Sequence, residues 1–196
     1  MERYKLSEIA DIQTGLVLTR KASDGTNEDY KYKRLTLRSV TEECILDVNS
    51  FEEYRAFERI DDQFLTQEND IILRLFYPIK TALIKVDHTG LVIPSQLAVV
   101  RIKEGSPYLP GYVSTYLSNN RFLSSMIEDA GMSAQKIIRV GSVADLTVPC
   151  LSASKQRIIA DIAEKQLELV ALYKEIAEQE TMRTKAIIKE IIGGRV

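Results

Sequence analysis

The sequence has 196 residues, of which 45% are hydrophobic and 28% charged, as is typical of a folded globular protein. It contains no apolar run of membrane-spanning length and no signal-peptide pattern at its amino terminus, so we expect a cytoplasmic protein. The two cysteines, Cys44 and Cys150, lack metal-ligand spacing and are interpreted as reduced thiols.

The formal net charge of −2 is not the basic footprint that most nucleic-acid-binding proteins carry. The charges are nevertheless unevenly distributed along the chain. Residues 42–70 hold ten acids and two bases, whereas residues 71–140 hold eight bases and four acids, and residues 20–38 are also basic. The folded chain can therefore present one basic face, although such segregation is more often an ordinary solvated surface.

The first half of the chain shows short patterns separated by turn signals. We expect a short helix over 6–12 that ends before Gly15, and strands over 33–40 and 44–48. A stronger strand signal covers 70–76, which is β-branched and bounded by Pro78, and residues 81–86 follow as its neighbour. Residues 87–90, Asp-His-Thr-Gly, predict a tight turn.

The second half begins with a β-rich centre and ends in a single long helical pattern. We expect strands over 91–93 and 97–102, helices over 109–117 and 121–129, and a last short strand over 146–148 that is closed by Pro149. Residues 154–192 then form a helical pattern without Gly or Pro, and Gly193 ends it. At ~1.5 Å per residue this helix is a rod of roughly 58 Å.

The long helix carries two apolar stripes. One heptad reading places five aliphatic residues on a seam: Ile158, Ile162, Leu169, Leu172 and Ile176. A second stripe includes Ile159, Val170 and Tyr173. Two stripes indicate more than one neighbour, so we favour an intermolecular helix pair over a helix that packs only on its own domain. We divide the chain into a globular domain, residues 1–150, and a helix region, residues 151–196.

A search for catalytic chemistry finds little. The glycines form no phosphate-binding loop, and the single histidine, His88, lies in a predicted turn and is interpreted as a surface residue. Cys/His metal sites are excluded by the residue counts. Asp70 with Lys80 or Lys85 is a weak match to a nuclease site, because a second carboxylate is missing. We therefore expect a binding protein without catalytic residues or a metal.

Candidate binding residues lie in polar turns around the β-rich centre. These turns are residues 74–80, 94–96 and 131–136. Arg and Lys neutralise phosphates, and Gln pairs bidentately with adenine. We predict DNA contacts from Arg74, Tyr77, Lys80, Gln96, Ser133, Gln135 and Lys136. Each turn taken alone is more often an ordinary loop.

The order of these motifs resembles the specificity subunits of type I restriction–modification systems. Residues 6–15 are similar to the start of a target-recognition domain, and Asn69 to Arg74 resembles the family's "Gly-Asp-Ile-Leu-Leu-Ser-Arg" strand. Residues 108–117 and 131–136 resemble its "fL.yyL" helix and "Gly-Ser-x-Gln" loop. Residues 146–149 followed by 154–159 resemble "i.iPl(P)...eQ.rI".

The resemblance implies an α+β target-recognition domain followed by a long spacer helix that forms an antiparallel coiled coil. Complete subunits of the family hold two such domains and two helices, so this chain resembles half of one and is expected to form a homodimer through its helix. The implied partners are double-stranded DNA, modification subunits that bring S-adenosylmethionine and methylate adenine, and a restriction subunit that uses ATP and Mg²⁺. No cofactor is expected in this chain.

Two alternatives remain open from the sequence. One is a half specificity subunit of a related methyltransferase complex without a type I nuclease. The other is a dimeric coiled-coil scaffold with no role on DNA.

Overall fold

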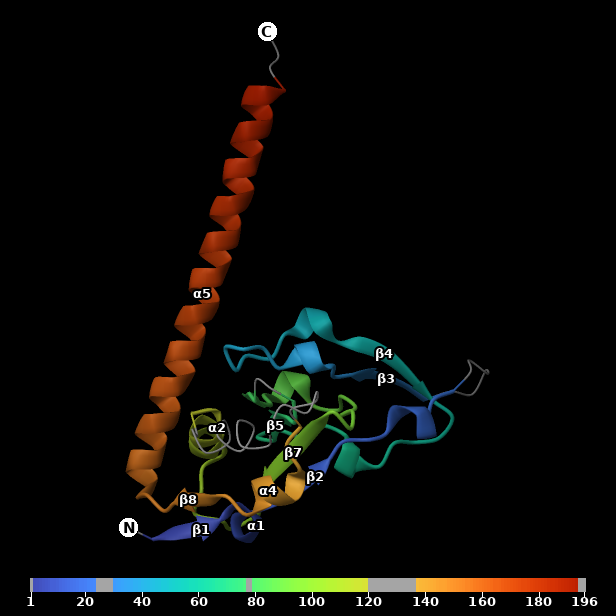
Figure 1. The fold of residues 1–196 in the computed structure, drawn as a ribbon, viewed down its shortest axis with the longest axis vertical. Coiled ribbons are helices and arrows are strands. Elements are labelled where there is room, and N and C mark those ends of the chain that lie inside the picture. The colour runs from blue at the N-terminus through green and yellow to red at the C-terminus, as the bar shows by residue number, and fades with distance from the viewer. Residues whose placement is uncertain (1, 24–29, 77–78, 120–136, 194–196) are drawn as a thin grey trace.

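The computed structural model describes residues 2–23, 30–76, 79–119 and 137–193. It has an α+β domain and a 40-residue helix, α5 (Ala153–Ile192), that projects well beyond the domain (Figure 1). The expected fold class is confirmed, although a coiled coil is not observed in the single chain. No helix in the described ranges combines the length and apolar character needed to cross a membrane.

The centre of the domain is a four-stranded antiparallel sheet with the order β2-β7-β5-β6. Its strands are β2 (Ala10–Thr14), β5 (Ile71–Arg74), β6 (Thr81–Leu83) and β7 (Leu97–Ile102). The predictions of strands near 70–76, 81–86 and 97–102 are confirmed. β5 and β7 are apolar on both faces because both faces of the sheet are covered, which explains their continuous rather than alternating hydrophobic pattern.

Strand alternation distributes the central side chains between two cores. Ile71 and Leu73 point to the face covered by α2 (Pro110–Ser118) and α4 (Val140–Ala144). Ile72 points to the opposite face, where Leu35 and Val40 pack against it. The predicted helix at 109–117 is confirmed as α2, and the predicted helix at 121–129 lies outside the described residues.

Two small pairs of strands complete the domain. β1 (Arg3–Lys5) pairs antiparallel with β8 (Thr147–Pro149), and the short α1 (Leu6–Ile9) follows β1. β3 (Tyr30–Arg34) and β4 (Glu52–Ala56) form a separate two-stranded ribbon. Five 3₁₀ turns connect these elements at Leu18–Arg20, Leu37–Ser39, Val48–Ser50, Asp62–Phe64 and Val86–His88.

Several local predictions are wrong. The first helix ends at Ile9, and Ile12 lies in β2, where it pairs with Val100. Residues 33–40 are a strand only as far as Arg34, and Leu37 begins a 3₁₀ turn. Two further short segments, 44–48 and 91–93, form isolated bridges rather than strands. The turn at 87–90 is confirmed, with Gly90 at φ +79°.

Three tyrosines on or just before α2 fasten β8. The hydroxyls of Tyr116, Tyr108 and Tyr112 donate to the carbonyls of Thr147, Val148 and Pro149 at 3.0, 3.1 and 2.9 Å. Burial raises the pKa of Tyr108 and Tyr112, so both hydroxyls remain protonated donors over the physiological range. Only residues 150–152 separate β8 from α5, so this array fixes the point where the helix leaves the domain.

Candidate nucleic-acid interface

Three of the predicted contact residues lie at one edge of the four-stranded sheet. Arg74 ends β5, Lys80 immediately precedes β6, and Gln96 immediately precedes β7. The Arg74 backbone N–H donates to the Lys80 carbonyl at 2.9 Å, and the Leu75 N–H donates to the Gln96 carbonyl at 3.3 Å. Residues separated by up to 22 positions are thus brought together by antiparallel pairing.

The remaining predicted contacts, Tyr77, Ser133, Gln135 and Lys136, lie outside the described residues. The chain is described again from Ile137, which forms an antiparallel bridge with Phe76. The neighbouring Ile138 N–H donates to the Leu75 carbonyl at 2.8 Å. Residue 137 therefore lies at the same sheet edge as Arg74 and Gln96.

The Arg74 guanidinium is only partly satisfied. Its Nη1 donates to the Val40 carbonyl at 3.4 Å, close to the limit for a hydrogen bond, and its buried Nε has no partner within the described ranges. Buried donors without partners are uncommon in folded proteins. Because a guanidinium has five N–H donors, this side chain retains hydrogen-bonding capacity for a ligand.

The side chains of Lys80 and Gln96 also have no polar partner among the described residues. Lys80 is half-buried and Gln96 is exposed. A cation, an amide and an arginine with spare donors therefore share one edge. Such groups can neutralise phosphates and bond to base edges.

Sequence reasoning missed one segment of this edge. Leu16 bridges to Pro94, and its carbonyl accepts the Ser95 N–H at 2.8 Å, which places the exposed Val17 beside the turn that carries Gln96. Gly15 makes this approach possible, because a Cβ there would lie 2.2 Å from the Ile93 carbonyl oxygen. The glycine was the available signal, but it was interpreted as the end of a helix.

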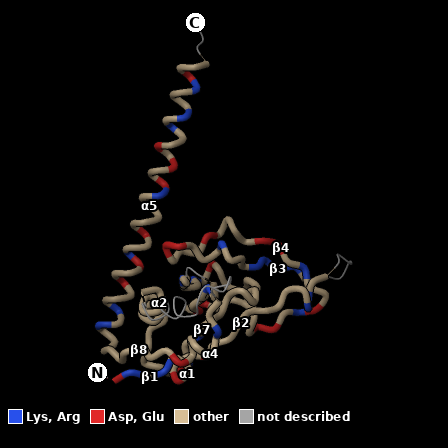
Figure 2. Tube along the Cα trace, viewed as in Figure 1, with Lys and Arg blue, Asp and Glu red and all other residues tan. Residues whose placement is uncertain are grey.

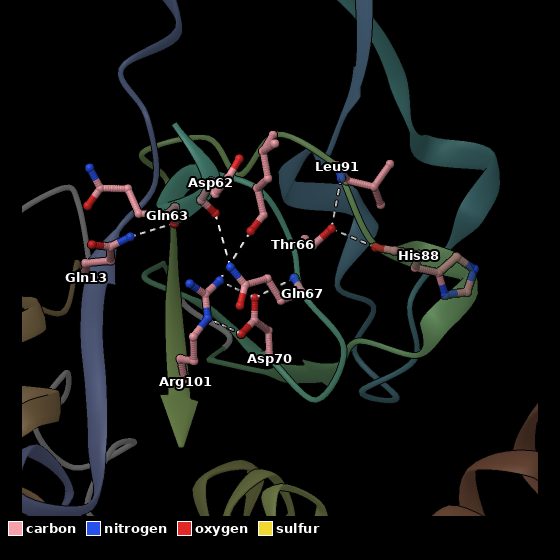
Figure 3. Close-up of polar contacts among 10 residues, drawn as sticks. Gln13, Asp62, Gln63, Thr66, Gln67, Asp70, His88, Leu91 and Arg101 are labelled. Carbon is pink, nitrogen blue, oxygen red and sulfur yellow. Dashed lines mark hydrogen bonds and ion pairs between the residues drawn. The ribbon is translucent and has the colours of Figure 1, made fainter. Parts of the chain in front are cut away.

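Asp70 forms part of a structural network at the opposite end of β5 from Arg74 (Figure 3). Both of its carboxylate oxygens accept from the Arg101 guanidinium at 2.7 Å, and one also accepts the Gln67 N–H at 2.8 Å. The Asp70 side chain is 1% exposed, and hydrogen bonding to it raises the pKa of Arg101. The described residues include no group of three His, Cys, Asp or Glu side chains arranged to hold a metal. Both carboxylate oxygens of Asp70 are therefore engaged in a structural ion pair with Arg101.

His88 and Thr66 belong to the same network. The Thr66 hydroxyl donates to the His88 carbonyl at 2.7 Å and accepts the Leu91 N–H at 2.9 Å (Figure 3). The His88 ring meets Phe51 edge-on, with the ring centroids 6.0 Å apart. These contacts agree with the interpretation of His88 as a turn residue.

The α5 helix presents different stripes to its own domain and to solvent. Gln156 is fully buried at its base, and Ala160 contacts α2 where a Cβ on Gly111 would lie 3.0 Å away. At ~100° per residue the predicted seam lies on the opposite side of the helix from this contact. The seam residues are all exposed: Ile158 57%, Ile162 66%, Leu169 43%, Leu172 55% and Ile176 55%.

Two ion pairs hold the middle of α5 against the domain. Lys85 contacts Glu164 at 2.9 Å, and Lys174 contacts Glu43 at 2.6 Å. The hydrogen bond from Lys174 lowers the pKa of Glu43 despite partial burial, and the bond from Lys85 lowers that of Glu164. α5 therefore packs on its own domain along one side and leaves an apolar stripe on the other.

Comparison with solved structures finds the same fold in type I specificity subunits. A crystal structure of the HsdS subunit from Thermoanaerobacter tengcongensis matches with a TM-score of 0.64 and 15% identity over 96% of this chain and 47% of that chain. A chain from a study of complex assembly and conformational transition of the type I R-M system matches with a TM-score of 0.61 and 14% identity, over 97% of this chain and 48% of that chain. The type I S subunit from M. genitalium matches with a TM-score of 0.56 and 14% identity, over 96% of this chain and 45% of that chain.

The chain therefore spans about half the length of these neighbours. No family model matches the sequence, and no curated protein matches it. At these identities the likeness concerns the fold, and it agrees with the resemblance found in the sequence motifs.

Proposed function

We propose that this chain is a DNA-recognition subunit of a type I restriction–modification complex, in a half-length form with one recognition domain. The observation that carries the proposal is the convergence of Arg74, Lys80 and Gln96 at one sheet edge, where their side chains keep donors that no other described residue accepts. The fold shared with type I specificity subunits supports it independently. In this role the chain binds DNA and positions its partner subunits on the target. It works in the cytoplasm, where the target DNA is found.

The chemistry belongs to partner subunits in this proposal. Modification subunits supply S-adenosylmethionine and methylate adenine, and a restriction subunit supplies ATP-dependent cleavage. Arg74 and Lys80 hold the duplex through phosphates, and Gln96 reads a base edge. Tyr77, Ser133, Gln135 and Lys136 complete the proposed contact set.

A second copy of the chain is the proposed partner of the exposed α5 stripe. Five aliphatic side chains at heptad spacing remain exposed on a helix whose other side already packs on the domain. A two-fold antiparallel helix pair would bury the stripe and relate two recognition domains by symmetry. The target would then be an interrupted palindrome, because the symmetry of a site mirrors that of its reader.

Methylome sequencing tests this function directly. The full chain is expressed with a type I modification subunit from the same genome in a host that lacks other adenine methylation. We expect one interrupted palindromic motif that disappears when the chain is omitted. Methylation of a motif with two different halves would refute the homodimer, and absence of any chain-dependent motif would refute the recognition role. When a candidate restriction subunit is added, restriction of unmethylated phage that bear the motif separates a type I complex from a methylase-only relative.

A further inference from the structure

The β3–β4 ribbon carries basic side chains that the sheet edge does not use. In this ribbon Lys31 lies opposite Arg55, and Lys33 lies opposite Glu53. All four side chains are exposed, because strand alternation directs Tyr32 and Tyr54 to the other face. Residues 30–40 include four bases and no acid. Two bases of the basic segment noted in the sequence, Lys31 and Lys33, thus share a solvent-facing surface with Arg55.

The inner face of the ribbon anchors this surface rigidly. The Tyr54 hydroxyl donates to the Leu18 carbonyl at 2.8 Å, and the Tyr32 hydroxyl accepts the Ile60 N–H at 3.1 Å. Ala56 is fully buried and bridges to Ala22. The outer cations therefore project from a fixed backbone rather than from a loose loop.

Neighbouring cations form ion pairs, whereas those on the outer face form none with other described residues. Lys21 pairs with Glu58 at 3.1 Å and Asp61 at 3.7 Å, and Arg34 pairs with Glu52. Within the described part of the chain, Lys31, Lys33 and Arg55 form no ion pair. Figure 2 shows the Lys and Arg positions along β3. With Glu53, the outer face carries three positive charges and one negative charge.

An open hollow of about 370 Å³ lies at this ribbon and is lined by Lys31, Lys33, Arg55 and their strand neighbours. Lys31 and Lys33 are ~6.6 Å apart along the strand. That separation spans about two base-pair steps of ~3.4 Å on one DNA strand. The outer face includes no Asn, Gln, Ser or Thr, so its chemistry suits phosphate oxygens better than a mixed pattern of base edges.

We propose that the outer face of the β3–β4 ribbon, formed by Lys31, Lys33 and Arg55, is a second, sequence-independent contact to the phosphate backbone of double-stranded DNA. This inference rests on the proposed recognition function and adds a surface to it. The residue 16–22 segment connects the two, because Leu16 bridges to Pro94 beside Gln96 and Ala22 bridges to the ribbon. The sheet edge reads sequence, and the ribbon binds the adjoining backbone.

Salt-dependent binding of the full-length chain to duplexes of random sequence and of the methylated motif tests this proposal. Each lost phosphate contact reduces the slope of log affinity against log salt by ~0.9. The Lys31→Ala/Lys33→Ala variant should therefore reduce it by about 1.8, and Arg55→Ala by about 0.9. Both variants should lower the affinity for the two duplexes by the same factor, so the ratio of the affinity for the motif to that for random sequence is unchanged. Glu53→Gln should strengthen binding to both.

The matched control is Lys185→Ala/Lys189→Ala, which removes the same charge from the far end of α5. Circular dichroism confirms folding of every variant. Unchanged slopes in the ribbon variants, or an equal change in the control, would overturn the phosphate contact. A changed ratio between the duplexes would show base reading instead, and competition by polyglutamate equal to that by DNA would indicate an acidic protein partner. Failure of the parent chain to bind any duplex would instead refute the proposed function itself.

Discussion

The Gln156 side chain on the first turns of α5 accepts the backbone N–H of Leu109, the residue that precedes α2, at 2.8 Å. Its amide nitrogen donates to the carbonyls of Pro107 and Leu151 at 3.0 and 2.9 Å. Leu109 is the N-cap of α2, and Gln156 satisfies the backbone N–H of this residue. A fully buried side chain thus joins the start of the long helix to the start of the helix beneath it.

Gln156→Leu should therefore destabilise the domain. The substitution removes the side-chain partner of three partly buried backbone groups, and we expect the free energy of unfolding to fall by about 3 kcal/mol in urea titrations. The control is Gln166→Leu, because Gln166 is exposed ten residues further along the same helix. An equal loss in both variants would mean that helix propensity, rather than this hydrogen-bond network, accounts for the effect.

The ion pair between Glu43 and Lys174 should depend on pH. Because the folded-state pKa of Glu43 is lowered, its contribution is present above the unfolded pKa of ~4.3 and is lost as pH falls through the folded value. A double-mutant cycle with Glu43→Gln and Lys174→Met should give a coupling of roughly 0.5 kcal/mol at pH 7, reduced by partial exposure. A coupling of the same size at pH 2 would exclude an ionic origin.

Leu172→Asp should dissociate the proposed homodimer, because it buries a charge in an apolar helix seam. Size-exclusion chromatography with light scattering measures the mass of the parent and the variant. Ala171→Asp is the control, since residue 171 is exposed and ~100° away around the helix. Retention of the parent mass by Leu172→Asp would remove the seam from the assembly surface.

The two kinds of contact at the sheet edge should separate experimentally. Lys80→Ala should lower the affinity for all duplexes. It should also reduce the slope of log affinity against log salt by about 0.9, as expected for the loss of one phosphate contact. Gln96→Ala should instead relax base preference at one position, at a cost of about 1–3 kcal/mol on the preferred site. Binding measurements on a library of single-base variants distinguish these results. If both variants behave as the parent, the edge is not the DNA surface.

Deleting one heptad beyond the domain contacts should shorten the distance between half-sites. Residues 177–183 lie past Lys174, so their removal preserves both ion pairs to the domain. The helix loses ~10.5 Å, equivalent to about three base pairs. Methylome sequencing should show the same half-sites with a shorter gap, or loss of methylation if the rotational phase fails. An unchanged gap would show that α5 does not set the spacing.

Patterns that repeat within one element were readable from the sequence, whereas those decided by a distant partner were not. The heptads of α5 and the β-branched run of β5 predicted both elements. The predicted seam is exposed, whereas the second stripe meets the domain only in part, since Ile159 packs against the core and Tyr173 is 63% exposed. Ile9 and Ile12 are spaced as two residues on one face of a helix. Antiparallel pairing with β7 instead places Ile12 in strand β2. Leu35 is buried as its apolar character suggests, although the backbone after it turns.

The candidate site was predictable in residue type more than in arrangement. Arg74, Lys80 and Gln96 stood out as polar residues in turns, and antiparallel pairing then placed them together. The β3–β4 ribbon was missed because 17 residues separate its short strands and no turn signal joins them. Its charges were visible, but only the pairing of Lys31 with Arg55 shows that they share a face.

The tyrosines that bind β8 also determine how force passes through the molecule. Residues 150–152 are the whole connection between β8 and α5, and Gln156 bonds to Leu151 within it, so no compliant linker separates helix from domain. A rotation of α5 about its axis is therefore transmitted to α2 and to the central sheet, where Arg74, Lys80 and Gln96 lie at the ends of the strands. In the proposed homodimer, rotation of one helix against the other would turn both sheet edges together, so the helix axis would set the orientation of each domain.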